Sequence, residues 1–153
     1  MPDTDPLVDE LAATAAQLRE LTRTASDAQL DAQSPGEWSV RTVLAHLRDD
    51  EFLVTRLRLE RMLVEDDPQL APFDEQAWEA SRWQGRDGLD ELLDDFQLQR
   101  DASIAILRRL EGDEWQRPGL QPEYGILTVR SWLDHWLKHD RMHLAQIARS
   151  LST

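Results

Sequence analysis

Residues 128–151, TVRSWLDHWLKHDRMHLAQIARSL, carry the helical pattern that decides the fold. Thr128 can act as an N-cap, because its hydroxyl can accept a hydrogen bond from a free backbone N–H of the first turn. At about 100° per residue, four side chains of this stretch share one stripe of the helix. They are Trp132, Trp136, His143 and Ile147. The pattern predicts a long helix that packs one face against a core.

Three further stretches place apolar residues at steps of three and four, which is the signature of a helix with one buried face. They are residues 6–24, 39–64 and 87–110. Two Pro- and Gly-containing connections separate them, residues 65–88 and 112–127, and residues 73–83 have the pattern of a short helix. We expect an all-α protein, a four-helix bundle with a long crossover connection, formed by one domain over residues 1–153. The long connection allows neighbouring helices to run parallel.

Charge and cysteine content exclude several function classes. The chain has 17 Lys and Arg against 30 Asp and Glu, so its formal net charge is −13. Such a charge repels phosphate backbones and anionic lipids, so we expect no nucleic-acid or membrane partner. The absence of cysteine excludes disulfides, thiolate metal ligands and a cysteine nucleophile. No signal peptide and no apolar run of transmembrane length is evident, and a cytoplasmic location is expected.

The four histidines of the chain are the clearest candidates for chemistry. His139 and His143 are four residues apart, so both rings can aim at one point from the same helix face. His46 borders the apolar stripe of the helix predicted at 39–64 and can reach the same interior. His135 falls further toward solvent, so we do not expect it to join them. Structural histidines without a metal remain the alternative interpretation.

Two stretches resemble the signatures of the DinB-like (DinB/YfiT-like) superfamily. The first is GEWSVRTVLAHL at 36–47, followed by RDDE, and the second is HDRMHLAQI at 139–147. The resemblance implies a four-helix bundle whose divalent metal is held by His46, His139 and His143. It also implies a metal-dependent hydrolase, or a transferase that uses a low-molecular-weight thiol such as bacillithiol or mycothiol, and a homodimer. Imidazole ligands suit Zn, Ni or Fe and do not select among them.

Two acidic residues fall on the predicted inner faces. Asp50 is four residues after His46, and Asp140 lies near the centre of the apolar face of residues 128–151. A buried carboxylate needs a partner. Either residue could accept a hydrogen bond from a ligand imidazole or act as a base for water. The alternative is a salt bridge to an arginine such as Arg48, Arg100 or Arg141.

Three functional hypotheses follow. The first is a metal-dependent enzyme, a hydrolase or a thiol S-transferase, that acts on a small molecule through the three histidines. The second is a non-catalytic, stress-related bundle that binds a metal or a small molecule. The third is a helical interaction module without metal. The sequence contains no P-loop, no dinucleotide-binding glycine turn and no serine-centred nucleophile elbow.

Overall fold

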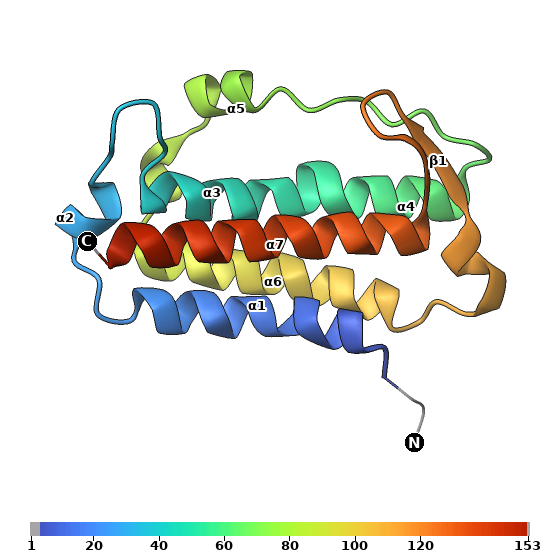
Figure 1. Ribbon diagram of the computed structural model, residues 1–153, viewed down its shortest axis with the longest axis horizontal. Helices are drawn as coiled ribbons and strands as arrows, with labels where there is room; N and C mark the ends of the chain where they lie inside the picture. Colours follow the sequence, from blue (N-terminus) through green and yellow to red (C-terminus); the bar gives the residue numbers. More distant parts are fainter. Residues whose placement is uncertain (1–3, 153) are drawn as a thin grey trace.

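Four long helical segments lie side by side in a bundle (Figure 1). The computed structural model describes residues 4–152, so the two ends of the predicted domain, residues 1–3 and 153, lie outside it. The segments are α1 (Pro6–Thr22), α3 (Val40–Asp50) continued by α4 (Arg56–Val64), α6 (Leu89–Leu107) and α7 (Val129–Leu151). The predicted four-helix bundle is confirmed, with boundaries within a few residues of those expected.

The long crossover lies between α4 and α6. From the end of α4 the chain returns along the bundle and forms α5 (Glu75–Ser81) and a 3-10 turn, η2 (Gln84–Arg86), before α6 begins. Because of this return, α6 runs parallel to α3 and α4 rather than antiparallel to them (Figure 1). The parallel arrangement that the long connection allows is therefore the one present, and α5 is the short helix expected within 73–83.

Hydroxyl side chains cap the starts of two long helices, and one of them is the predicted N-cap Thr128. The Ser39 hydroxyl accepts a hydrogen bond from the backbone N–H of Thr42, and the Thr128 hydroxyl accepts one from that of Ser131. The structure also forms a short helix, α2 (Asp27–Asp31), that the sequence did not predict. Ser26 starts α2 with a capping box, a local signal that supports even one turn of helix.

The second connection contains a hairpin that the sequence did not predict. After a 3-10 turn, η3 (Gly112–Gln116), strands β1 (Pro118–Gln121) and β2 (Gly125–Thr128) pair antiparallel. Four-residue strands that contain proline and glycine carry little periodicity, which explains why the pattern was missed. Gly125 has a φ of +79°, which favours glycine. The amide of Leu70 donates to the carbonyl oxygen of Leu120, so the hairpin is joined to the crossover.

A buried polar layer divides the core into two apolar clusters. One cluster surrounds Trp132 and Trp136, and the other includes Val43, Phe96 and Ile147. Six buried polar residues lie between the two clusters along the helices and form the polar layer: His46, Asp50, Glu51, Arg100, Asp140 and His143. Burying so many polar groups is costly, which marks this layer as the candidate site.

Within residues 4–152, no helix is long and apolar enough to cross a membrane.

Candidate metal centre

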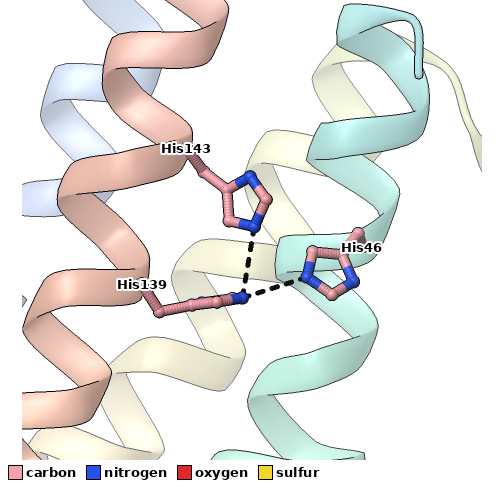
Figure 2. A group of neighbouring side chains, drawn as sticks. All are labelled: His46, His139 and His143. Atoms are coloured by element: carbon pink, nitrogen blue, oxygen red, sulfur yellow. Dashed lines mark hydrogen bonds between the residues drawn. The ribbon is translucent and has the colours of Figure 1, made fainter. Parts of the chain in front are cut away.

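Three imidazole rings converge in the polar layer (Figure 2). His46 comes from α3, while His139 and His143 come from successive turns of α7. The Nε2 atom of His139 lies 3.0 Å from that of His46 and 3.2 Å from that of His143. Nitrogens bonded to zinc at about 2.0–2.1 Å lie about 3.0 to 3.4 Å apart in octahedral or tetrahedral geometry. The structure thus brings the three predicted ligands together at spacings that could hold a divalent ion.

Neighbouring side chains orient two of the rings. Nδ1 of His143 donates to Oε1 of Gln146 at 2.8 Å, which leaves the Nε2 lone pair free for a ligand. The ring of His46 packs against two tryptophans, with centroids 5.1 Å from Trp38 and 5.6 Å from Trp78. These contacts place each ring before any ion binds.

The three rings are uncharged at neutral pH. Burial, and then repulsion from His139, lowers the pKa of His46 to about 2. Burial, and then repulsion from His143, lowers the pKa of His139 to about 4. Burial also lowers the pKa of His143. Because a metal ligand must be neutral imidazole, the burial that makes protonation costly keeps the lone pairs available.

Asp50 adds a carboxylate to the cluster. Its Oδ2 lies 3.6 Å from Nε2 of His139 and 4.0 Å from Nε2 of His46. Burial, and then the negative charge of Glu75, raises the pKa of Asp50 to about 7. A carboxyl group with this pKa exchanges its proton near neutral pH, as a general base requires. The predicted position of Asp50 agrees with the structure, whereas its role stays a prediction.

Asp140 takes part in a buried ion pair. Its Oδ2 accepts hydrogen bonds from Thr14 Oγ1 and Arg100 Nη1, both at 2.6 Å, and its Oδ1 accepts one from Arg100 Nη2 at 3.0 Å. Arg100 also binds both oxygens of Glu51. Burial lowers the pKa of Arg100, but Glu51 and Asp140 outweigh it and raise the pKa overall. The salt-bridge alternative is therefore the arrangement observed for Asp140, with Arg100 as its partner.

The other two arginines considered as partners face elsewhere. Arg48 pairs with Asp49 and Asp87, and Arg141 pairs with Glu10 at the surface. Among residues 4–152, Asp50 is the carboxylate that lies within 4.0 Å of the clustered imidazoles.

Glu51 is a buried acid that the sequence did not single out. A π-helical turn, η1 (Glu51–Thr55), begins directly after Asp50. The three successive acids at this junction are all buried, with different partners. Asp49 binds Arg48, Asp50 lies beside the imidazoles, and Glu51 binds Arg100. Spacing four residues after the buried Leu47 places Glu51 on the inner side of the helix, but it does not indicate its partner.

Two pockets reach the cluster at different residues. The first has a volume of about 440 Å³ and includes Asp50 and His139 in its wall. The second has a volume of about 720 Å³ and includes His143 and Gln146, and Glu75 lines both. His135 is half-buried in the wall of the first pocket and stacks on Tyr124, with ring centroids 4.8 Å apart. It does not join the three imidazoles, as the sequence indicated.

Sequence reasoning missed several residues around the site. Trp38 lies eight residues before His46, and no sequence pattern indicated that the two rings are in contact. Arg58 lines the first pocket from α4, within a run that reads as an ordinary charged helix face. Gln121 lines it from the hairpin that was not predicted. Gln146, three residues after His143, is the one neighbour that helical spacing could have indicated.

Comparison with known proteins gives consistent results. A model of the DinB superfamily matches residues 10–147. A Bacillus subtilis protein named "Putative metal-dependent hydrolase YfiT" is 28% identical over 156 residues, which covers 94% of this chain and 81% of the relative. An Oceanobacillus iheyensis protein, also named as a metal-dependent hydrolase of this kind, is 27% identical over 73% of this chain and 64% of its own length. The solved structure of YfiT, described as an unusual four-helix bundle topology, superposes with a TM-score of 0.86 at 25% identity, covering 98% of this chain and 89% of that one.

Proposed function

The chain belongs to the DinB superfamily, and from that premise we propose that it is a divalent-metal-dependent hydrolase of a small molecule. One observation carries the proposal. Three neutral imidazoles converge beside a carboxylate, and two of these four groups, Asp50 and His139, line a pocket of about 440 Å³. A volume of this size suits a small organic molecule.

The donor set fits a divalent ion of the Zn, Ni or Fe type. His46, His139 and His143 would hold it through Nε2, and three protein ligands leave room for a further one. A divalent ion held this way acts as a Lewis acid toward water and toward a carbonyl oxygen. Gln146 supports the site by fixing the tautomer of His143.

Asp50 is the proposed general base. Its carboxylate lies beside the imidazoles at the pocket wall, where it can take a proton from the attacking water. With a pKa of about 7, a substantial fraction of Asp50 is ionised at neutral pH and can accept that proton. Trp132 and Trp136 form apolar parts of the same wall and limit access of bulk water to the reacting groups.

A second candidate function is transfer of a low-molecular-weight thiol to an electrophile. The observation that favours it is the second pocket, which reaches the cluster at His143 while the first reaches it at His139. Two molecules could therefore approach the same centre from different sides, as a transferase requires and a hydrolase does not. Both candidate functions use the same three histidines.

Elemental analysis tests the metal centre. The protein is purified without a chelator and without a His tag, beside the double variant His139→Ala/His143→Ala. We expect about one divalent ion per chain in the wild type and none in the double variant. His135→Ala is the matched control, because His135 lies one turn from His139 on α7 but outside the cluster. The proposal fails if the wild type takes up none of Zn, Ni, Fe or Mn.

A substrate screen of the loaded protein separates the remaining hypotheses. Turnover of esters or amides in water alone, lost in Asp50→Asn, supports the hydrolase. Turnover that requires an added thiol supports the transferase instead. A stoichiometric metal without turnover in either screen would favour the non-catalytic metal-binding bundle.

A further inference from the structure

Arg58 is a buried cation without an ion-pair partner. Its side chain is 8% exposed, and no carboxylate of residues 4–152 lies within 4.0 Å of its nitrogens. Nη2 donates to the carbonyl oxygen of Ala71 at 2.8 Å, and the guanidinium stacks on Trp132 at 5.1 Å. The remaining N–H groups, on Nε and Nη1, have no partner in the described chain, although buried guanidinium groups in proteins are normally paired.

Arg58 lines the first pocket and also a smaller one, of about 310 Å³, that includes Ala71. Burial lowers the pKa of Arg58, and the charges that act on it in the other direction belong to Asp50, Tyr124 and Glu123. All three of these residues line the first pocket, as Arg58 itself does. Among residues 4–152, the side-chain polar atoms that are fully buried and lack a partner are His46 Nδ1 and Arg82 Nε. The unpaired nitrogens of Arg58 are not among them, so they are not completely shielded from solvent. They are therefore accessible to solvent, and we take the first pocket, which Arg58 shares with Asp50 and His139, as the side from which a ligand reaches them.

Gln121 supplies a second donor on the same wall. Its side chain is 1% exposed, and its Oε1 accepts hydrogen bonds from the backbone N–H groups of Glu123 and Tyr124 in the hairpin turn. These two donors fix the orientation of the amide, so its NH₂ group points away from the turn. In the described chain this NH₂ has no partner, and it is not sealed from solvent either. Two buried side chains with free donors thus line the pocket that Asp50 and His139 also line.

We propose that Arg58 and Gln121 form a carboxylate-binding subsite, so that the substrate of this pocket is a small monocarboxylate. A guanidinium and an amide NH₂ are matched donors for the two oxygens of a carboxylate, and a charged partner removes the cost of burying Arg58 unpaired. Bound there, the carboxylate anchors the molecule while its reactive group faces the imidazoles. That this monocarboxylate is the substrate of the reaction rests on the proposed function. That Arg58 and Gln121 bind a carboxylate does not depend on it.

The acidic residues of the pocket limit the ligand to one negative charge. Asp50, Asp74, Glu75 and Glu123 line the same wall, and the last three are exposed at its rim. They repel a phosphate ester or a polycarboxylate, whereas one carboxylate can pass and pair with the guanidinium. The apolar surface of Phe73, Trp132 and Trp136 accommodates an uncharged aromatic or aliphatic portion.

Binding of hippurate, N-benzoylglycine, tests the subsite by isothermal titration calorimetry on the zinc-loaded protein. Its neutral analogue, N-benzoylglycinamide, has the same shape without the charge. We expect hippurate to bind the wild type at least about tenfold more tightly than the amide does. Arg58→Gln should abolish this preference. Arg61→Gln, which removes the same charge one turn away on α4 where Arg61 pairs with Glu65, should leave it unchanged.

Gln121→Glu provides a second test that keeps the fold. The new carboxylate retains an oxygen for the N–H groups of Glu123 and Tyr124 but replaces the free donor with an anionic acceptor. We expect hippurate binding to weaken at least about tenfold while zinc content stays the same. The inference is overturned if hippurate and the amide bind equally, if neither binds, or if only His139→Ala/His143→Ala changes hippurate binding. Arg58-dependent binding in a protein that holds no metal would support the subsite and count against the proposed function alone.

Discussion

Nε2 of His46 lies 3.0 Å from Nε2 of His139, although the two residues are 93 positions apart in the chain. The contact joins α3 to α7 in the polar layer between the two apolar clusters of the core. Two neutral imidazoles at this distance can form one N–H···N hydrogen bond. A cation bound by both nitrogens would connect the two rings more strongly than that hydrogen bond does. An ion bound here would therefore tie two helices of the bundle together.

Zinc is expected to raise the melting temperature of the protein. At a free zinc concentration about 100 times the dissociation constant, a ligand that binds only the folded state stabilises it by about 2.7 kcal/mol. For a domain of this size that corresponds to a rise of roughly 5–10 °C. Circular dichroism melts of chelator-treated protein, with and without zinc, measure the shift. His46→Ala should lose it and His135→Ala should keep it; an equal shift in His46→Ala would contradict a three-histidine site.

Gln146 should control zinc affinity without touching the ion. Its Oε1 accepts the hydrogen on Nδ1 of His143 at 2.8 Å and so directs the Nε2 lone pair into the cluster. Loss of such a supporting partner typically costs about 10- to 100-fold in metal affinity. We expect this loss in Gln146→Leu and not in Gln146→Glu, which keeps an acceptor. Competition titration with a chromogenic chelator measures both variants, and equal affinity of Gln146→Leu and wild type would refute the role.

The pH dependence of zinc binding should come from Asp50. The pKa values of His46 and His139, about 2 and about 4, leave both rings neutral above pH 5.5. Asp50, with a pKa of about 7, must release its proton when a cation binds beside it. Zinc affinity should therefore fall by up to about tenfold per pH unit below pH 7 and level off above it. Because burial holds the pKa of His143 below its ordinary value of 6.5, Asp50→Asn should flatten the profile between pH 6.5 and 8. A wild-type slope that persists in this variant over that range would exclude Asp50 as its source.

Much of the bundle could be predicted because its helices bury regular stripes, and the histidine set followed from spacing and from the signature resemblance. Partners across the bundle could not be predicted in the same way. The partner of Arg100 is Glu51, which lies on another helical segment 49 positions away, and spacing within one helix does not indicate such a pair. The hairpin that carries Gln121 is too short to show a period. Arg58 was missed because an unpaired buried arginine looks, in sequence, like any other on an amphipathic helix.

Asp50 should destabilise the metal-free protein at high pH. The pKa of Asp50 is higher in the folded state, at about 7, than the ordinary value of 3.8. The folded state therefore holds its proton more tightly, and the stability that this provides at low pH is lost as the pH rises from about 4 to about 7. We expect Asp50→Asn to raise the melting temperature of chelator-treated protein by several degrees at pH 8 and by much less at pH 4.5. A shift of the same size at both pH values would contradict this assignment.

Asp140 belongs to a buried ion pair with Arg100, whereas Asp50 belongs to the metal centre, so we expect the ion pair to control the stability of the metal-free protein. Removing the guanidinium in Arg100→Met leaves Glu51 and Asp140 buried without compensation, a change that typically costs about 3–5 kcal/mol. Arg108→Met, which breaks an exposed pair with Asp9, should have a far smaller effect, because solvent screens exposed ion pairs. Urea unfolding of the metal-free variants measures both costs.

Asp140→Asn completes the comparison, since it keeps the shape of the side chain but weakens its hydrogen bonds to Arg100 and Thr14. We expect it to lower the free energy of unfolding while leaving zinc affinity within about twofold of wild type. Asp50→Asn should do the reverse at pH 8, lowering zinc affinity while stabilising the metal-free fold. If Asp140→Asn instead weakened zinc binding at unchanged stability, Asp140 would belong to the metal centre, and the ion pair with Arg100 would be secondary to that role.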